Sequence, residues 1–227
     1  MVSIRQCLDA PDENEEVIQG KSKTWCEVQK LFPIFHPSTN QTLENIQTYF
    51  FVGWNHMMNL SSWDHWMFTI LLVLPFEFQD WKKWLTAISL FTLGHTLTLV
   101  LCAFFPNLLA VSWIETAIVA TIVFTAFGNI FQWSGKNFFW SGILSSFFGL
   151  LHGLAFGKDV AGMLPQEGKF ASIVGFGLGL EAAQLVGVLS VLVITTIFNS
   201  VLPNKNRELV LVVSGIGIGM SLFKLIF

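Results

Sequence analysis

A small set of histidine, carboxylate and amide side chains lies within the long apolar stretches of this sequence. Imidazole is a ligand that zinc, copper, iron and nickel share, while carboxylates add oxygen ligands and negative charge. An ionisable group at the centre of a bilayer costs at least about 2.5 kcal/mol, so each one requires a reason. The set therefore predicts a pathway for a divalent transition-metal cation, with these candidate ligands: His56, Asp64, His65, His95, Glu115, His152, Glu181 and Gln184.

Two of the carboxylates also have a structural interpretation. Asp64 follows Ser61 by three residues, and Glu115 follows Ser112 by three. This is the spacing of a capping box, which satisfies free amide groups at a helix start. Capping is therefore an alternative to ion binding at both positions.

The histidines within the apolar stretches have structural alternatives as well. His152 lies beside Gly149 and Gly153, whose spacing favours close helix contact, so an interhelical hydrogen bond is its alternative role. His95 could form a similar structural bond. Glu181 is harder to explain in this way, because a carboxylate near the middle of a bilayer has no water to solvate it.

The elements that carry these residues have the composition of a membrane protein. Of the 227 residues, 53% are hydrophobic and 12% are charged, whereas a soluble domain carries about twice that share of charge. The net charge of −3 provides no basic surface, so no nucleic-acid partner is expected. Cys102 lies in an apolar run and is expected to pack as a small hydrophobic residue, while pairing of Cys7 with Cys26 stays open.

The lengths of the apolar segments predict an all-α membrane domain over residues 46–227, after a polar, acidic N-terminal tail over residues 1–45. The stretch 46–60 is too short to span and is interpreted as an interfacial or re-entrant segment. A bundle of about six transmembrane helices follows, because open sheet edges cannot persist in lipid. Their predicted ranges are 63–78, 84–105, 109–133, 138–157, 170–198 and 208–227.

Basic residues in the connections predict the orientation. Lys82, Lys83, Lys136, Lys205 and Arg207 all fall on one side, which the positive-inside rule makes cytoplasmic. The protein is then expected to be a multi-pass protein of the plasma (inner) membrane with both termini outside. Membrane lipid is its expected surroundings, and a homo-oligomer is an open option.

The predicted helices place the candidate ligands at different depths. At about 1.5 Å per residue, His95 and Glu181 lie near the midplane, about 15 Å below the outer surface, and Glu115 and His152 lie about 8 to 9 Å below it. His56, Asp64 and His65 mark the outer rim. The set is therefore predicted to form a funnel that narrows from the rim to the midplane.

Five short motifs follow one another along these segments: Gly53-x-x-His56, Asp64-His65, Phe91-Thr92-x-Gly94-His95-Thr96-x-Thr98-Leu99, His152-Gly153-x-x-Phe156 and Gly179-x-Glu181-x-x-Gln184. Over about residues 47–198 the series resembles the HupE/UreJ family of hydrogenase- and urease-linked membrane proteins. Members of that family are regarded as nickel or cobalt permeases, so the resemblance implies that cation passage involves His56, Asp64, His65, His95, His152 and Glu181.

The chain departs from the family pattern at three points. Thr96 stands where Ser is usual, Gly177 stands where Asn is usual, and the gap from His56 to Asp64 is longer than in the hydrogenase-linked branch. The missing Asn removes one oxygen that could serve as a metal ligand.

The leading hypothesis is a secondary permease, not an enzyme, that moves a divalent transition-metal cation from outside to the cytoplasm. Nickel and cobalt are the expected ions, with zinc as a further candidate, and no prosthetic group is expected. No GxxxxGK[ST] loop is present, so a gradient or an energised partner must drive the flux. The alternatives are an intramembrane zinc hydrolase, with three histidines as ligands and Asp64 or Glu115 as base, and a purely structural membrane subunit.

Overall fold

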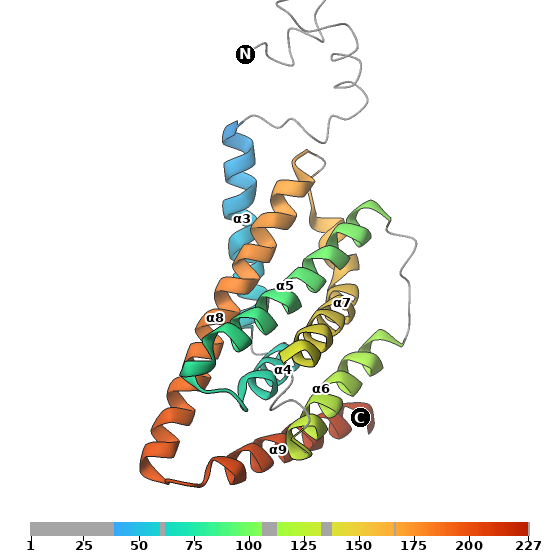
Figure 1. Ribbon diagram of the computed structural model, residues 1–227. Helices are drawn as coiled ribbons and strands as arrows, with labels where there is room; N and C mark the ends of the chain where they lie inside the picture. Colours follow the sequence, from blue (N-terminus) through green and yellow to red (C-terminus); the bar gives the residue numbers. More distant parts are fainter. Residues whose placement is uncertain (1–38, 60–61, 106–112, 133–137, 166, 227) are drawn as a thin grey trace, which may run out of the picture.

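The computed structural model describes residues 39–59, 62–105, 113–132, 138–165 and 167–226. These residues form seven α-helices and one short 3-10 helix, without a strand among them (Figure 1). The prediction of an all-helical fold is confirmed there, while Cys7, Cys26 and the tail up to position 38 lie outside the described residues. The elements are α3 (Thr39–Met58), α4 (Trp63–Val73), η2 (Phe78–Asp80), α5 (Trp81–Phe104), α6 (Ile114–Ile130), α7 (Phe138–Met163), α8 (Lys169–Val201) and α9 (Asn206–Ile226).

The segment predicted to be half-length is a complete helix. α3 has 20 residues, which corresponds to about 30 Å. It begins at Thr39, within the predicted tail, and its first turns consist of polar residues. The prediction of a short interfacial or re-entrant segment over 46–60 is therefore wrong in length, and polar residues at the helix start hid its true extent.

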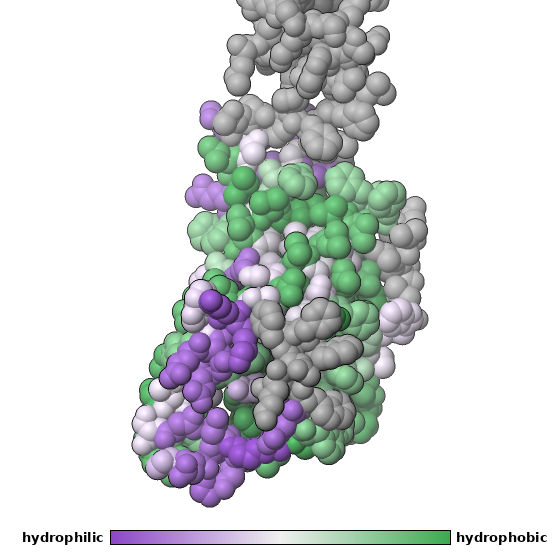
Figure 2. Space-filling model, in the orientation of Figure 1, coloured by the Kyte–Doolittle hydropathy of each residue, from purple (hydrophilic) through white to green (hydrophobic). Residues whose placement is uncertain are grey.

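Long apolar helices make up much of the rest of the chain. Three stretches are long and apolar enough to cross a membrane, namely Phe78–Phe104, Lys169–Val201 and Asn206–Ile226, and the shorter apolar helices are Ile114–Ile130 and Gly142–Gly157. Figure 2 shows hydrophobic residues over much of one face, with hydrophilic residues gathered at the end where α5 and α9 begin. This end carries the basic residues that were predicted to share one side, except Lys136, which lies outside the described residues.

Two closely packed helix pairs, α5 with α7 and α3 with α8, form the framework of the bundle. On α7, Gly149 lies against the backbone of Phe91 on α5, and Gly153 lies against the backbone of His95. On α8, Gly179 lies against the backbone of α3 in the same way. A Cβ atom at any of these positions would overlap main-chain atoms, so the predicted close contact at the α7 glycines is confirmed.

α3 and α4 follow one another along α8, and the break between them lies between Met58, where α3 ends, and Trp63, where α4 begins. Gly53 of α3 meets Phe176, and further along α8 Gly187 meets Trp66 of α4. α4 has 11 residues, about half the number that a membrane crossing requires. The two helices therefore behave as one interrupted helix, an arrangement that in membrane proteins brings polar groups and helix ends into the interior.

Packing against three helices holds the second half of this interrupted helix in place. Phe68 and Leu71 of α4 form one buried cluster with Phe91 of α5, Ile122 of α6 and Phe148 of α7. Between membrane helices such van der Waals packing, rather than exclusion of water, provides the attraction. α4 is thus fixed relative to α5 and α7, which carry the candidate ligands His95 and His152.

α9 packs along α6 in the opposite direction. Arg207, near its start, donates hydrogen bonds to the carbonyl oxygens of Asn129, at 2.8 Å, and Ile130, at the end of α6. Asn129 in turn donates to the carbonyl oxygen of Leu71, at 2.7 Å. These bonds satisfy carbonyl groups at helix ends, and they leave the last turn of α9 beside the first turn of α6.

Candidate metal centre

Four histidines, from α3, α4, α5 and α7, meet at the break between α3 and α4. The ring centre of His65 lies 4.8 Å from that of His56, 5.2 Å from that of His152 and 6.0 Å from that of His95. Ligand atoms of His56, His65 and His95 lie within 4.8 Å of one another. We call these four residues the histidine cluster.

The predicted funnel is therefore wrong for the histidines, because they converge instead of following one another in depth. The physical reason lies in the interrupted helix. α3 is a complete helix, so it carries His56 from its start in the predicted tail down to the level of His95, and the short α4 begins there with His65.

Three of the four histidines are buried and His56 is half-buried, and most of the ring nitrogens have no hydrogen-bond partner. His95 and His152 are 0% exposed and His65 is 6% exposed. The Nε2 atoms of His56, His65 and His152 and both ring nitrogens of His95 are buried without a partner. Each such group costs about 1–3 kcal/mol, and a bound cation is one explanation for several of them in one place. The structural hydrogen bond considered for His95 is not formed within the described part of the chain.

Two of the histidines are oriented by their other ring nitrogen. Nδ1 of His65 lies 3.0 Å from Oδ1 of Asp64, and Nδ1 of His152 lies 2.9 Å from the carbonyl oxygen of Phe148, to which it donates. Metal-ligating histidines commonly bond a carboxylate or a carbonyl group in this way, which leaves the Nε2 lone pair for the ion. The bond of His152 lies within its own helix, so the predicted alternative of an interhelical bond is wrong.

Phenylalanine rings surround the imidazoles. The ring of Phe156 stacks on His56 with 3.7 Å between centres, Phe176 stacks on His95 at 6.1 Å, and Phe91 lies 5.3 Å from His152. These rings limit access of water and strengthen electrostatic interactions in the cluster. The role of these rings could not be predicted from the sequence, although Phe91 and Phe156 stand within the motifs quoted above.

Glu181 and Gln184 lie beside the cluster and not within it. Ser89 Oγ donates to Glu181 Oε1 at 2.5 Å, and Thr92 Oγ1 donates to Gln184 Oε1 at 2.8 Å. Since Thr92 precedes His95 by one helical turn, the two bonds form a polar seam between α5 and α8 that starts next to the cluster.

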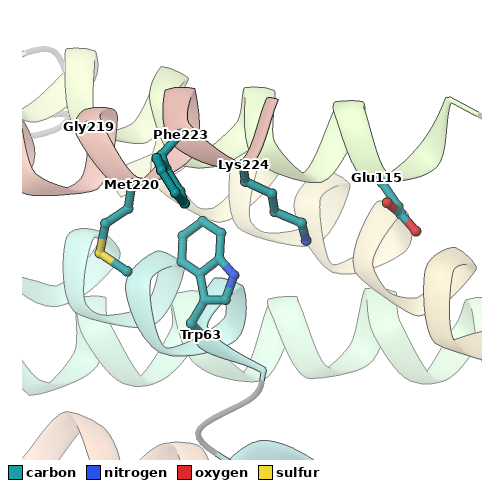
Figure 3. Close-up of a pocket in the computed structure, with 6 residues that line it drawn as sticks. All are labelled: Trp63, Glu115, Gly219, Met220, Phe223 and Lys224. Carbon is teal, nitrogen blue, oxygen red and sulfur yellow. The ribbon is translucent and has the colours of Figure 1, made fainter. Parts of the chain in front are cut away.

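The capping interpretation of Asp64 and Glu115 falls partly outside the described residues, because Ser61 and Ser112 lie there. Asp64 accepts hydrogen bonds from the backbone and ring of His65, and Ser62, at the start of α4, makes no side-chain cap. Glu115 is separate from the histidines. It lines a pocket between α4, α6 and α9, together with Trp63, Gly219, Met220, Phe223 and Lys224 (Figure 3).

Two of the departures from the family pattern lie next to one another in the structure. A Cβ atom at Gly177 would lie 2.7 Å from Thr96 Oγ1, so a larger side chain at position 177 would require the Thr96 side chain to shift. The longer gap between His56 and Asp64 spans the end of α3 and the start of α4.

The described residues are all helical apart from their connections, include long apolar helices and hold buried imidazole nitrogens without partners between α3 and α4, features typical of a helical membrane protein with polar groups in its interior. More specifically, the chain belongs to the HupE/UreJ family, since the family model described as HupE / UreJ protein matches residues 35–226. This match confirms the resemblance and extends it to α9. The family implies an accessory or transport role in nickel or cobalt metabolism and is not known as a catalytic one. No curated protein and no solved structure matches the chain.

Proposed function

We propose that this chain is a secondary permease for a divalent transition-metal cation, nickel or cobalt, which it moves from outside into the cytoplasm across the plasma membrane. One observation carries the proposal: buried imidazole nitrogens without partners converge from α3, α4, α5 and α7. Imidazole favours nickel, cobalt, zinc and copper, whereas magnesium and calcium prefer oxygen ligands. The cation is the substrate in this account.

The spacing of the ligands suits an ion that stays briefly. Nitrogens that hold an ion tetrahedrally at about 2.1 Å lie about 3.4 Å from one another, whereas the ligand atoms of His56, His65 and His95 are spread over as much as 4.8 Å. Conduction requires binding that is favourable enough for entry and weak enough for release. Ligands on different helices can approach the ion and withdraw from it.

The polar seam offers a continuation of the path. Gln184 and Glu181 lie along α8 beside Thr92 and Ser89 of α5, and their side chains supply oxygen ligands and one negative charge. An ion that leaves His95 would meet these oxygens next. In this proposal the seam leads toward the end that carries the basic residues, which is the cytoplasmic side with both termini outside.

An intramembrane zinc hydrolase needs several histidines at one point, and the convergence of the histidines provides this. Catalytic zinc, however, keeps three protein ligands and an open position for water, and it needs a base within reach of that water. Asp64 is bonded to His65, and Glu115 lies in the separate pocket. The permease therefore remains the better supported proposal.

Flux of nickel, cobalt, zinc and manganese into proteoliposomes tests the proposal. We expect uptake of nickel or cobalt in preference to manganese, and loss of that uptake in a His95→Ala, Glu181→Ala double variant. Glu208→Gln, which changes an exposed carboxylate on α9, is the matched control and should transport normally. Uptake that is unchanged in the double variant would refute the permease assignment.

A further inference from the structure

The pocket between α4, α6 and α9 contains two opposite charges that the permease proposal does not use. Lys224, in the last turn of α9, places Nζ 5.6 Å from the ring centre of Trp63. Glu115, in the first turn of α6, lines the same pocket. Neither forms an ion pair within the described residues, where the ion pairs are those of Asp64, Lys83 and Lys205. Figure 3 shows the ammonium group of Lys224 pointing toward the side of the pocket where Glu115 lies.

This pocket lies next to the histidine cluster. Trp63, which forms its wall, is followed directly by Asp64 and His65 in the first turn of α4. A cation in the pocket therefore lies at the turn of α4 that also carries His65, and the positive charge of Lys224 opposes its approach.

We infer that the pocket is the vestibule through which a divalent cation reaches the histidine cluster. Glu115 is the carboxylate that attracts the cation into the vestibule. Lys224 is a tethered cation that occupies the vestibule when no metal ion is there. The inference rests on the proposed function. A carboxylate lowers the energy of an approaching divalent ion, and an ammonium group beside it opposes entry. The flexible stem of lysine allows the charge to move aside, and Glu115 offers it an alternative position near the entrance.

The geometry supplies a matched pair of lysines for the test. Lys224→Met keeps an unbranched stem against Trp63 and removes the charge. Lys82 lies 5.5 Å above Trp81 in a similar arrangement at the start of α5, so Lys82→Met is its control. The probe is cobalt, whose visible absorption reports imidazole coordination, added to the purified full-length protein in a stopped-flow instrument.

We expect Lys224→Met to accelerate cobalt loading on the order of tenfold, and Glu115→Gln to slow it by a similar factor, because charges at an entrance act mainly on the association rate. Lys224→Arg and Lys82→Met should load at the wild-type rate. The absorption spectrum should be the same in every variant, because the imidazole ligands are unchanged.

A steric test uses two glycines of α9. A Cβ atom at Gly219, which lines the pocket, or at Gly215, one turn earlier, would have no atom within 4 Å. Both positions therefore have open space around an added Cβ atom, and leucine is substituted at each. Gly219→Leu should slow loading by at least fivefold, and Gly215→Leu should leave it unchanged. An equal effect of both substitutions would instead indicate contact between α9 helices of two chains.

The outcomes separate the inference from the proposed function. If the wild-type protein loads no cobalt with an imidazole spectrum, both the permease proposal and the vestibule are overturned. If it loads cobalt and Lys224→Met, Glu115→Gln and Gly219→Leu all load at the wild-type rate, the vestibule alone is overturned, because the ion then reaches the cluster by another way.

Discussion

The histidine cluster differs from the hydrophilic end where α5 and α9 begin, called the polar end here, in whether its polar groups have partners. At the polar end, Lys83 pairs with Asp80 at 2.6 Å and Lys205 pairs with Glu208 at 2.5 Å, while Arg207 bonds the carbonyl groups at the end of α6. In the cluster, five ring nitrogens are buried without a partner. At the polar end these side chains are paired with neighbouring groups, whereas in the cluster these ring nitrogens have no partner in the protein.

This difference separates structure from function. Exposed pairs and caps contribute little each, but they satisfy groups that the fold itself creates. Unpartnered buried nitrogens stabilise nothing and lower the stability of the folded state until a ligand meets them. Replacement of a cluster histidine should therefore preserve folding but weaken or abolish metal binding.

The largest effect is expected from His95→Leu, which should abolish cobalt or nickel binding while the metal-free protein melts at the wild-type temperature or above it. Leucine is similar in volume to histidine and brings no unsatisfied nitrogens into the core. The matched substitution is Asn129→Leu, which breaks a buried bond to Leu71 and should lower the melting temperature while binding is retained. Thermal unfolding in detergent, with and without metal, measures both. A lower melting temperature of metal-free His95→Leu would contradict the account.

A smaller effect is expected from Asp64→Asn. The substitution keeps the shape but removes the negative charge that orients His65 at 3.0 Å, and loss of such a partner typically lowers metal affinity by about 10–100-fold. Titration calorimetry with cobalt measures the change. Asp80→Asn, which removes a carboxylate from the polar end, should bind like the wild type. Equal affinity of Asp64→Asn and the wild type would show that the carboxylate has no role in the site.

Helix packing gives the next effect in size. Gly153→Ala would push a Cβ atom into the backbone of His95, and such overpacking typically costs about 1–3 kcal/mol. We expect a lower melting temperature together with weaker metal binding, because His95 is displaced. Gly162→Ala, on the same helix with no atom within 4 Å of the added Cβ, should be neutral or slightly stabilising. Similar results for both variants would contradict the close contact of α5 and α7.

The smallest effect is expected at the polar end. Lys205→Met removes an exposed ion pair with Glu208, and such pairs are worth about 0–1 kcal/mol. Melting temperature and metal affinity should both stay close to those of the wild type. A loss of metal binding in this variant would mean that the two regions are coupled, against the comparison drawn above.

Much of the fold could be predicted from the sequence because lipid restricts the choice so strongly. Apolar length placed α5, α8 and α9 within three residues of their bounds, although α7 extends six residues beyond its predicted end, and the cost of burying His95 and His152 marked them as important. The glycines Gly149 and Gly153 predicted that α7 packs closely against another helix, but not that this helix is α5.

Convergence of the site could not be predicted, because depth was counted along helices that were assumed to be continuous. The polar first turns of α3 concealed its length. Because α3 extends from Thr39 to Met58 and α4 begins at Trp63, His56 and His65 lie at the level of His95 and not at the assumed rim. The pocket was missed for a different reason. Trp63, Glu115 and Lys224 come from three elements whose packing no local pattern encodes.

The central claim is that the four imidazoles at the break between α3 and α4 bind a transition-metal cation. X-ray absorption spectroscopy of the protein loaded with nickel or cobalt tests it most directly, because imidazole ligands add a characteristic outer-shell scattering to the nitrogen shell. We expect this imidazole pattern in the wild type and its loss, with the bound metal, in His95→Leu. A first shell made only of oxygen, or an unchanged spectrum in His95→Leu, would contradict it.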